Sequence, residues 1–491
     1  MKKVFEGSCF CQSSSIINSI IYSLSEPPYM SEITESDIQA AKVQTNNGGL
    51  ETIYFDMEHM ATFYKRIKEL GMHRGDEQFI KMHLFDSWES QIAYIDDSKH
   101  YLQYESKMMR YCIHKVLEEQ FEIDEIVWID EAGRIGNPRW ENAQIFRGEN
   151  GKVSIPKQVF FSVYDKNKSP WVIKVFTWDD DESQVNIYTA EPQEKVNELW
   201  QSFQDYFAEK GPMRGELFTP MGEYIESNGN TFDDVVLSDE VKDKVMMNTV
   251  EFFKNIKKYG EHGLSTSRGV ILAGKPGTGK TLTLESIISA FPQYTRIYAT
   301  SESLMGRHHI RHMYKIARML KPSIVFIEDI DTLGASDDDD YYRTPLLGEI
   351  LTALNSIESN DEILTIATTN YPDALDIAIR DRPGRFDVRI DFEMPDRDAR
   401  RIILKKYLSN FNIDESLIKY DKIIKETDGF SGAWLVELVQ TSFSFALRDD
   451  SNDPTITIAN LESAMKVVKE NRVLAKKQRD SMEESSHMYG A

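Results

Sequence analysis

The sequence predicts an α/β fold with buried parallel strands for the second half of the chain and an α+β region before it. Three observations carry this prediction. Short apolar runs alternate with helical patterns, as buried parallel strands and their crossover helices do. A glycine-rich turn joins one such run, Val270–Leu272, to the helical pattern Leu282–Ile288. After Pro395 the pattern is helical as far as about Arg472.

The composition is that of a globular protein. A chain of 491 residues is long enough for roughly three domains, and 41% apolar residues suffice for a sizeable core. Its 57 basic and 80 acidic residues give a net charge of −23, which disfavours nucleic acid as a partner. No run reaches the ~20 apolar residues of a membrane span. Three cysteines cannot form a disulfide framework, so we expect a cytoplasmic protein.

The first 215 residues contain no recognisable catalytic motif. Residues 1–120 are expected to be a mostly helical N-terminal region. From residue 121 the apolar period changes to two, so residues 121–215 are expected to be a small β-rich module with a connecting helix. The expected elements are helices at 57–70, 104–120 and 193–210, a strand at 125–129, and a hairpin of strands 158–164 and 171–178. Gly211–Gly215 is the expected boundary before the next module.

The glycine-rich turn has the composition of a phosphate-binding P-loop. Glycines let backbone N–H groups surround anionic oxygens, and the helix N-terminus adds partial positive charge. Lys280 is expected to reach the outer phosphates, and the Thr281 hydroxyl to ligate Mg²⁺. An ordinary strand–turn–helix is the alternative. The predicted nucleotide-binding residues here are Gly274, Pro276, Gly277, Thr278, Gly279, Lys280, Thr281 and Leu282.

Acidic and amide side chains follow the next apolar strands. Glu328 and Asp329 come directly after the apolar run Ser323–Ile327. At the carboxyl end of a buried parallel strand, one carboxylate can hold Mg²⁺ through water while its neighbour orients or deprotonates the attacking water. A helix N-cap is the alternative reading of these acids. Asn370 follows the run Ile363–Thr369, where its amide can bind the γ-phosphate or that water.

A turn rich in arginine, residues 380–387, completes the predicted catalytic set. Guanidinium groups stabilise the charge that develops on a transferred phosphoryl group, and they can come from a neighbouring subunit. Arg382 and Arg385 are the predicted residues, and Arg380 is a third possibility for the arginine that acts in trans. Surface ion pairs are the alternative explanation for this cluster.

Together these residues resemble the AAA family of ring ATPases, from about Phe232 to Arg472. Phe232–Val235 resembles the motif near the family's adenine pocket, residues 375–387 resemble its second region of homology, and Asp428–Ala433 resembles the sensor-2 turn of its helical lid. The resemblance adds Asp234, Val235, Gly432 and Ala433 to the nucleotide site. It implies ATP and Mg²⁺ as cofactors, and a homo-oligomeric ring of about six subunits with its nucleotide sites at subunit interfaces.

The resemblance also implies the domain organisation of the second half. Residues 216–395 would be the large subdomain, a doubly wound parallel sheet, and residues 396–475 the helical lid. Residues 476–491 would be a flexible tail.

Two departures from the family pattern bear on function. Most members have Asp-Glu where this chain has Glu328-Asp329, an order similar to the mitochondrial branch that translocates the Rieske protein. By register, Glu328 takes the metal side and Asp329 the water-activating side. The family's pore loop carries an aromatic residue, whereas the corresponding Leu304-Met305-Gly306 has none.

The sequence therefore predicts an ATP-hydrolysing ring that remodels or translocates a protein client, in the manner of a chaperone. Residues 1–215 would select the client, whose identity the sequence does not indicate. The alternative is a nucleotide-controlled assembly or signalling scaffold, in which hydrolysis is slow and nothing is threaded. The missing pore aromatic and the Glu-Asp order favour this alternative.

Overall fold

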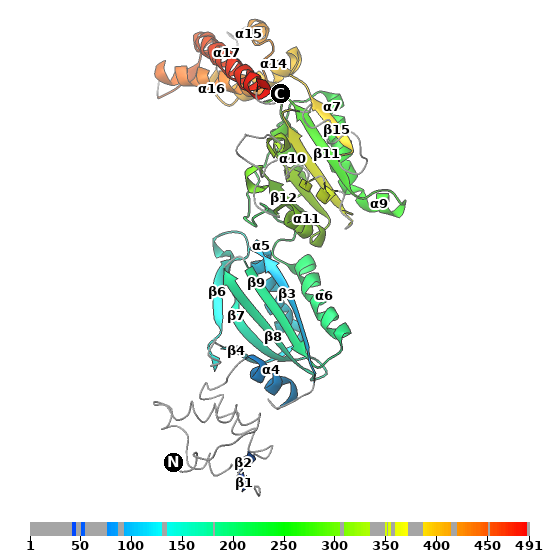
Figure 1. The fold of residues 1–491 in the computed structure, drawn as a ribbon. Helices are drawn as coiled ribbons and strands as arrows, with labels where there is room; N and C mark the ends of the chain where they lie inside the picture. Colours follow the sequence, from blue (N-terminus) through cyan, green and yellow to red (C-terminus); the bar gives the residue numbers. More distant parts are fainter. Residues whose placement is uncertain are drawn as a thin grey trace. The chain divides into compact units, whose positions relative to one another are not determined.

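The computed structural model describes thirteen segments of the chain, which divides into two compact units, residues 1–212 and 213–491. Each unit is described by itself below (Figure 1). The described residues are 42–45, 51–54, 76–86, 93–129, 135–179, 182–304, 309–333, 349–350, 352–354, 359–371, 386–413, 420–449 and 452–488.

The first unit is built on a seven-stranded antiparallel sheet in the order β3-β9-β8-β7-β4-β5, with β6 paired to β7. Figure 1 shows this sheet with its helices α4, α5 and α6. Its strands are β3 (Ile95–Leu102), β4 (Glu122–Ile129), β5 (Ile135–Gly136), β6 (Arg139–Gln144), β7 (Lys152–Tyr164), β8 (Pro170–Asp179) and β9 (Glu182–Thr189). A separate pair, β1 (Lys42–Thr45) and β2 (Glu51–Tyr54), is antiparallel.

Helices cover both faces of this sheet, because successive residues of a strand point to opposite sides. Phe160 of β7 contacts Phe79 of α4 (Asp76–Phe85), with 5.6 Å between ring centroids. The next residue, Phe161, lies 5.7 Å from the His114 ring of α5 (Gln103–Gln120). Helix α6 (Gln193–Lys210) packs beside α5. The hairpin expected at 158–164 and 171–178 is present as β7 and β8.

Strands β1, β2 and β3 all lie in the region expected to be mostly helical. Residues 95–102 form β3, which pairs with β9 at the edge of the sheet. Its sequence, Ile-Asp-Asp-Ser-Lys-His-Tyr-Leu, has no apolar alternation, since an edge strand needs few buried side chains. Pairing with β9, which is distant in sequence, therefore decides its structure. The helix expected at 57–70 lies outside the described residues.

The second unit begins with the predicted α/β fold. Its six-stranded sheet is parallel in every pairing, in the order β10-β12-β13-β14-β11-β15. The strands are β10 (Leu217–Phe218), β11 (Arg268–Gly274), β12 (Thr295–Ala299), β13 (Ser323–Ile327), β14 (Ile363–Thr369) and β15 (Val388–Phe392). Because β11 lies between β14 and β15, the chain reverses its direction across the sheet at β11, and such switch points form ligand sites at the carboxyl ends of strands.

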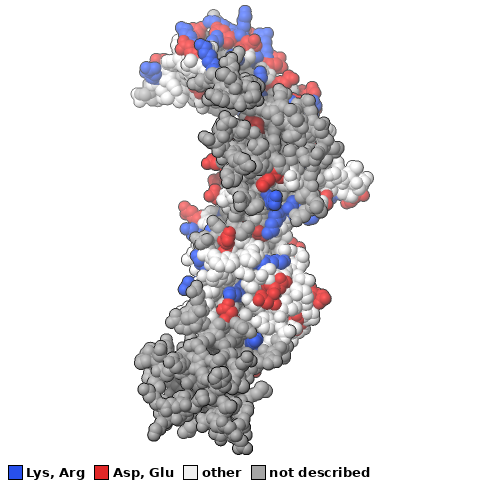
Figure 2. All heavy atoms as spheres, in the orientation of Figure 1, with Lys and Arg blue, Asp and Glu red and all other residues white. Residues whose placement is uncertain are grey.

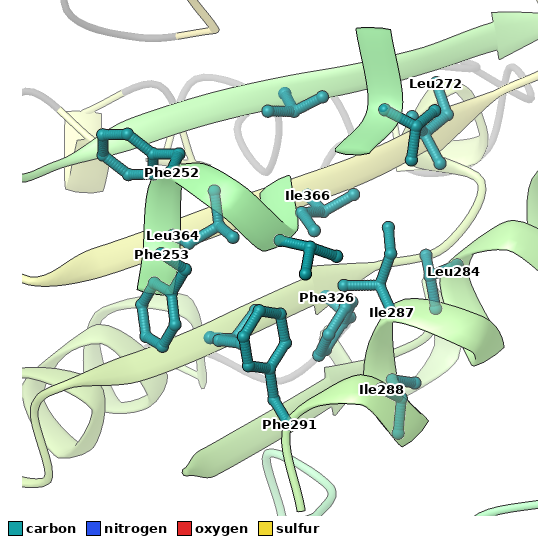
Figure 3. Packing of buried hydrophobic residues seen from close by; sticks show 14 of the residues in the cluster. Phe252, Phe253, Leu272, Leu284, Ile287, Ile288, Phe291, Phe326, Leu364 and Ile366 are labelled. Carbon is teal, nitrogen blue, oxygen red and sulfur yellow. The ribbon is translucent and has the colours of Figure 1, made fainter. Parts of the chain in front are cut away.

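Apolar side chains from both layers form the core of this subdomain (Figure 3). Leu272 of β11 and Phe326 of β13 are buried from the sheet, and Leu284 of α10 (Lys280–Ala290) covers them. Phe252 and Phe253 come from the helical stretch before β11. That stretch comprises α7 (Asp239–Met246), a π-helical turn (Met247–Glu251), α8 (Phe252–Lys254) and α9 (Ile256–Glu261); α11 (His309–Met319) precedes β13. This packing fixes the strand that ends in the glycine-rich turn.

A helical subdomain with its own core follows the sheet. It comprises α14 (Arg397–Leu408), α15 (Tyr420–Glu426), α16 (Gly432–Asp449) and α17 (Ile458–Met488), with a short parallel pair, β16 (Asn412–Ile413) and β17 (Thr455–Ile456). Helix α17 continues through Met488, into the segment 476–491 expected to be a tail, and residues 458–488 contain neither glycine nor proline. Among the described helices, none is long and apolar enough to cross a membrane.

Candidate functional site

The glycine-rich turn connects β11 to α10 and is closely packed on both sides. Gly277 and Gly279 have positive φ angles of 77° and 100°, which glycine adopts without strain. A Cβ atom on Gly274 would lie 2.3 Å from the carbonyl oxygen of Phe392. The glycines are therefore required by the local backbone. Pro276 is exposed in the turn, and Leu282 is half-buried in the first turn of α10.

Lys280 is buried at the start of α10, with its ammonium group directed into the turn. Its Nζ donates to the carbonyl oxygens of Gly274 (2.6 Å) and Lys275 (3.0 Å) and to Oδ1 of Asn370 (2.9 Å). Burial lowers the pKa of this ammonium, and the nearby carboxylates oppose that shift. The Thr278 hydroxyl closes the turn by donating to the Lys275 carbonyl oxygen at 2.8 Å. A concentrated positive charge thus lies where the sequence predicts the outer phosphates.

Glu328 faces Thr281, as the predicted metal site requires. The Thr281 hydroxyl donates to Oε1 of Glu328 at 2.8 Å, and the hydroxyl of Tyr298 donates to Oε2. Thr281 is exposed, and its oxygen keeps its lone pairs for another ligand. Carboxylate and hydroxyl oxygens are hard ligands of the kind that Mg²⁺ prefers. These residues therefore fit the metal that the P-loop resemblance implies.

Asp329 is connected to Lys280 through the side chain of Asn370. Asn370 Nδ2 donates to Asp329 Oδ1 at 3.0 Å, while the oxygen of the same amide accepts from Lys280. The Asp329 backbone N–H donates to the Thr368 hydroxyl at 2.9 Å. Its φ of 49° is uncommon for a non-glycine residue. Burial, then the charges of Asp331 and Glu328, raise the pKa of Asp329.

Asp331 is a residue of this network that the sequence reasoning missed. Its Oδ1 accepts a hydrogen bond from the Asn370 backbone N–H at 3.0 Å, so it anchors the end of β14. Asp331 is the third acid in the run Glu328-Asp329-Ile330-Asp331, and this position could have identified it as a residue of the site. Thr368 and Tyr298 were also missed, because each sits on a different strand and belongs to no local motif.

The predicted adenine-side residues join the sheet subdomain to the helical one. Lys406 of α14 donates to Asp234 Oδ1 at 2.9 Å and to the Asp233 carbonyl oxygen at 2.8 Å. Hydrogen bonds from Lys406 and Thr231 lower the pKa of Asp234 to about 2. Val235 is buried, and its Cγ1 would lie 3.6 Å from a Cβ atom on Gly279.

The sensor-2 turn reaches the P-loop directly. The Ala433 backbone N–H donates to the Gly277 carbonyl oxygen at 3.4 Å. A Cβ atom on Gly277 would lie 2.7 Å from Ser431 Oγ and 2.8 Å from Ala433 Cβ. Gly432 begins α16 between these two residues. The residues of the two subdomains that were predicted to bind one nucleotide therefore meet at Gly277.

The pore-loop prediction needs a correction at Leu304. This residue ends a 3₁₀ turn, Glu302–Leu304, and is fully buried in the subdomain, so it cannot contact a client in this conformation. An apolar side chain at the end of a tight turn packs inward because burial is favourable. Met305 and Gly306 lie outside the described residues, as do Arg380, Arg382 and Arg385.

Comparison with known proteins finds relatives of part of this chain, and a family model matches within the second unit. Residues 270–394 match the model of the ATPase family associated with various cellular activities (AAA). The chain is 34% identical over 248 residues to the ATP-dependent zinc metalloprotease FtsH of Syntrophotalea carbinolica, covering 48% of this chain and 37% of that protein. It is 33% identical over 297 residues to the m-AAA protease component YTA10 of the Saccharomyces cerevisiae mitochondrial inner membrane, covering 55% and 38%. It is 32% identical over 254 residues to a YME1 homologue of Schistosoma mansoni, an ATP-dependent zinc metalloprotease, covering 50% and 37%.

The chain therefore contains an AAA ATPase domain with the α/β P-loop fold, and ATP hydrolysis is the activity of that family. These matches span less than two fifths of each relative's length. The similarity supports the AAA family but not the narrower resemblance to the Rieske-protein translocase branch. That resemblance rested on the order of two residues, Glu328 and Asp329, whereas the matches weigh some 250 to 300 positions.

Proposed function

We propose that this chain is the ATP-hydrolysing subunit of a homo-oligomeric AAA ring, a hexamer, that remodels or translocates a protein client. One observation carries the proposal. The hydrogen bonds of Lys280, Asn370 and Asp329 form one connected network at the carboxyl ends of β11, β13 and β14. A cation, an amide and a carboxylate of raised pKa are the groups that the hydrolysis of a phosphoanhydride needs.

The chemistry assigned to these residues follows from their charges. Water attacks the γ-phosphoryl group, a new P–O bond forms, and the bond to the ADP oxygen breaks. Asp329 accepts a proton from the water, and its raised pKa makes it a better base than an ordinary aspartate. Asn370 holds Asp329 in place, while Lys280 neutralises charge on the phosphate oxygens. Mg²⁺, held by Thr281 and through water by Glu328, would supply further charge neutralisation on the same oxygens.

The names of the relatives are the reason for proposing a protein as the client. The relatives are ATP-dependent proteases, and the match covers about half of this chain. Residues 1–491 contain no His-Glu-x-x-His motif, so the activity proposed for these residues is remodelling of the client. The first unit, residues 1–212, is proposed to select the client. Acidic and basic side chains are interspersed on the visible face of the helical subdomain (Figure 2), and this mixture is unlike the continuous basic surface of a nucleic-acid motor.

A scaffold whose assembly is controlled by nucleotide is the second candidate function. One observation favours it: Leu304, at the position expected for the pore loop, is buried, and no aromatic residue accompanies it. In this alternative, hydrolysis times ring formation, and no client is threaded. A cytoplasmic location is proposed for either function, on the grounds of few cysteines and of the buried free thiol of Cys112.

A comparison of ATPase rates distinguishes the candidates. The purified chain is assayed for phosphate release with and without an unfolded protein, and its particles are sized by mass photometry with ATP. Remodelling predicts ATP-dependent rings whose ATPase is stimulated by the client and loses that stimulation in Met305→Ala. Met247→Ala, which alters an exposed methionine of the π-helical turn Met247–Glu251, is the control. Rings without stimulation support the scaffold, and a chain that releases no phosphate contradicts both.

A further inference from the structure

The carboxylate of Glu328 is held by two neighbours at once. Oε1 accepts from Thr281 at 2.8 Å, and Oε2 accepts from the hydroxyl of Tyr298. Thr281 belongs to the P-loop helix α10, whereas Tyr298 belongs to β12, on the opposite side of β13 from β14. The two donors therefore approach the carboxylate from different elements, and each takes a different oxygen.

The backbone places Tyr298 at this carboxylate. Strands β12 and β13 are parallel neighbours in which Tyr298 pairs with Phe326 and Ala299 with Ile327. One residue further, the Glu328 backbone N–H donates to the Ala299 carbonyl oxygen at 2.8 Å. Glu328 is thus tied to β12 through its backbone and through its side chain. The phenol hydroxyl reaches the carboxylate from a strand that is itself part of the buried sheet.

The Glu328 side chain is long, so the hydrogen bond from Tyr298 to Oε2 restricts its motion. Glutamate has one more rotatable bond than aspartate, so its carboxylate loses more conformational freedom when it is fixed. The Thr281 hydroxyl alone restrains a single oxygen and leaves the carboxylate free to rotate. A donor on Oε2 removes that freedom. A tyrosine phenol is protonated at neutral pH and can donate this hydrogen bond.

We propose that Tyr298 is a positioning residue for Glu328, whose hydroxyl holds Oε2 so that Oε1 faces Thr281 on the metal side of the nucleotide site. Tyr298 itself touches neither the nucleotide nor the metal in this assignment. The inference rests on the proposed ATPase function, because it assigns Tyr298 a role in the same site. Its sequence neighbours gave no sign of that role, since the short run Thr-Arg-Ile-Tyr-Ala around Tyr298 belongs to no motif.

The test is Tyr298→Phe, which removes the hydroxyl and keeps the ring. The first readout is equilibrium binding of a fluorescent, non-hydrolysable ATP analogue during a Mg²⁺ titration, which requires no turnover. We expect the analogue to bind equally well without Mg²⁺, while the Mg²⁺ midpoint rises about tenfold, the size expected for one hydrogen bond to a charged group. The kcat for ATP should fall by a similar factor, with KM little changed. Midpoints do not depend on the fraction of active protein, so partial misfolding does not obscure the result.

Tyr294→Phe is the matched control. Tyr294 lies four residues earlier, and its ring packs against Phe253 and Phe291, away from Glu328. Removal of its hydroxyl should leave the Mg²⁺ midpoint unchanged. A midpoint that shifts equally in both variants would indicate a general structural effect and overturn the inference.

A double-mutant cycle with Glu328→Asp separates positioning from packing. The shorter aspartate carboxylate withdraws from Tyr298, so Tyr298→Phe should have little further effect in that background. An undiminished effect in the Glu328→Asp protein contradicts the proposal, as does an unchanged Mg²⁺ midpoint in the single variant. If the wild-type chain binds Mg²⁺ and the analogue but never hydrolyses ATP, the proposed function fails while the binding comparison still tests Tyr298.

Discussion

The side-chain amide of Asn370 donates to the carboxylate of Asp329 at 3.0 Å. Its oxygen accepts from Lys280 at 2.9 Å, so a single amide connects the P-loop cation to the predicted base. An amide can do this because it carries a donor and an acceptor on one rigid group. The bridge joins the ends of two strands to the P-loop helix, and it fixes the two charged groups to which we assign the phosphate oxygens and the attacking water.

The first prediction concerns Asp329 as the base. Asp329→Asn should retain binding of ATP and ATP-dependent oligomers but lower phosphate release at least about 100-fold, the contribution of general base catalysis. Release is measured under saturating ATP with a coupled assay. Asp391→Asn, an exposed acid of β15, is the control and should retain the wild-type rate. Normal turnover in Asp329→Asn would exclude this residue as the base.

The second prediction concerns stability and pH. Because the pKa of Asp329 is raised in the folded state, the native carboxyl still holds its proton at a pH between the unfolded and folded pKa values, where the unfolded chain has released it. Its contribution to stability is therefore present at low pH and is lost as the pH rises through the folded pKa. At pH 7 the buried carboxylate destabilises the fold, so Asp329→Asn should have a higher Tm than the wild type. The difference should shrink as the pH approaches about 4. Thermal scans across this range test it, and an equal or lower Tm at pH 7 would contradict it.

The third prediction separates two effects of Gly277. Gly277→Ala introduces a methyl group 2.7 Å from Ser431 Oγ and 2.8 Å from Ala433 Cβ, at a φ of 77°. The backbone strain lowers the free energy of unfolding by about 1–2 kcal/mol. The clash also moves the helical subdomain away from the P-loop. Gly263→Ala is the control, because it has a φ of 70° but open space around its Cβ. Both variants should lose stability, but only Gly277→Ala should lose nucleotide affinity.

The fourth prediction concerns the contact between the two subdomains. Lys406→Ala removes the ion pair with Asp234 and the bond to the Asp233 carbonyl oxygen. The pair is partly exposed, so the change in the free energy of unfolding should be small. Nucleotide release, followed by stopped-flow fluorescence, should be several-fold faster because the helical subdomain closes less firmly over the loop.

Lys422→Ala is the control for this variant. It breaks a pair with Glu462 that lies wholly within the helical subdomain. A release rate that is the same in both variants would argue against a role for Lys406 in closure.

The fifth prediction follows from the burial of Leu304. Leu304→Ala should lower the free energy of unfolding by about 2–5 kcal/mol, as deletion of a buried leucine side chain does. Denaturant titration measures this change. Client-stimulated ATPase activity per folded molecule should stay near the wild-type value. A loss of stimulation without a loss of stability would indicate instead that Leu304 contacts the client.

The sequence alone determined those features of the protein whose residues lie close together in the chain. The P-loop could be predicted because Gly274, Lys280 and Thr281 act through one turn and the helix that it begins. Glu328 and Asp329 could be predicted because each follows a strand whose apolar run is unmistakable. The α/β class followed for the same reason, since the strand and helix periods are local properties of the sequence.

Only the tertiary structure decided which distant residues meet. Tyr298, Asp331 and Thr368 join the site because parallel pairing aligns strand ends that are 30 or more positions apart. Residues 95–102 become a strand because β9 is there to pair with them. Leu304 turns inward because a core lies beneath it, whereas the sequence shows only an apolar residue at a loop position. In each case the structure is determined by contacts between residues that are distant in sequence, and the local periodicity of the sequence does not show such contacts.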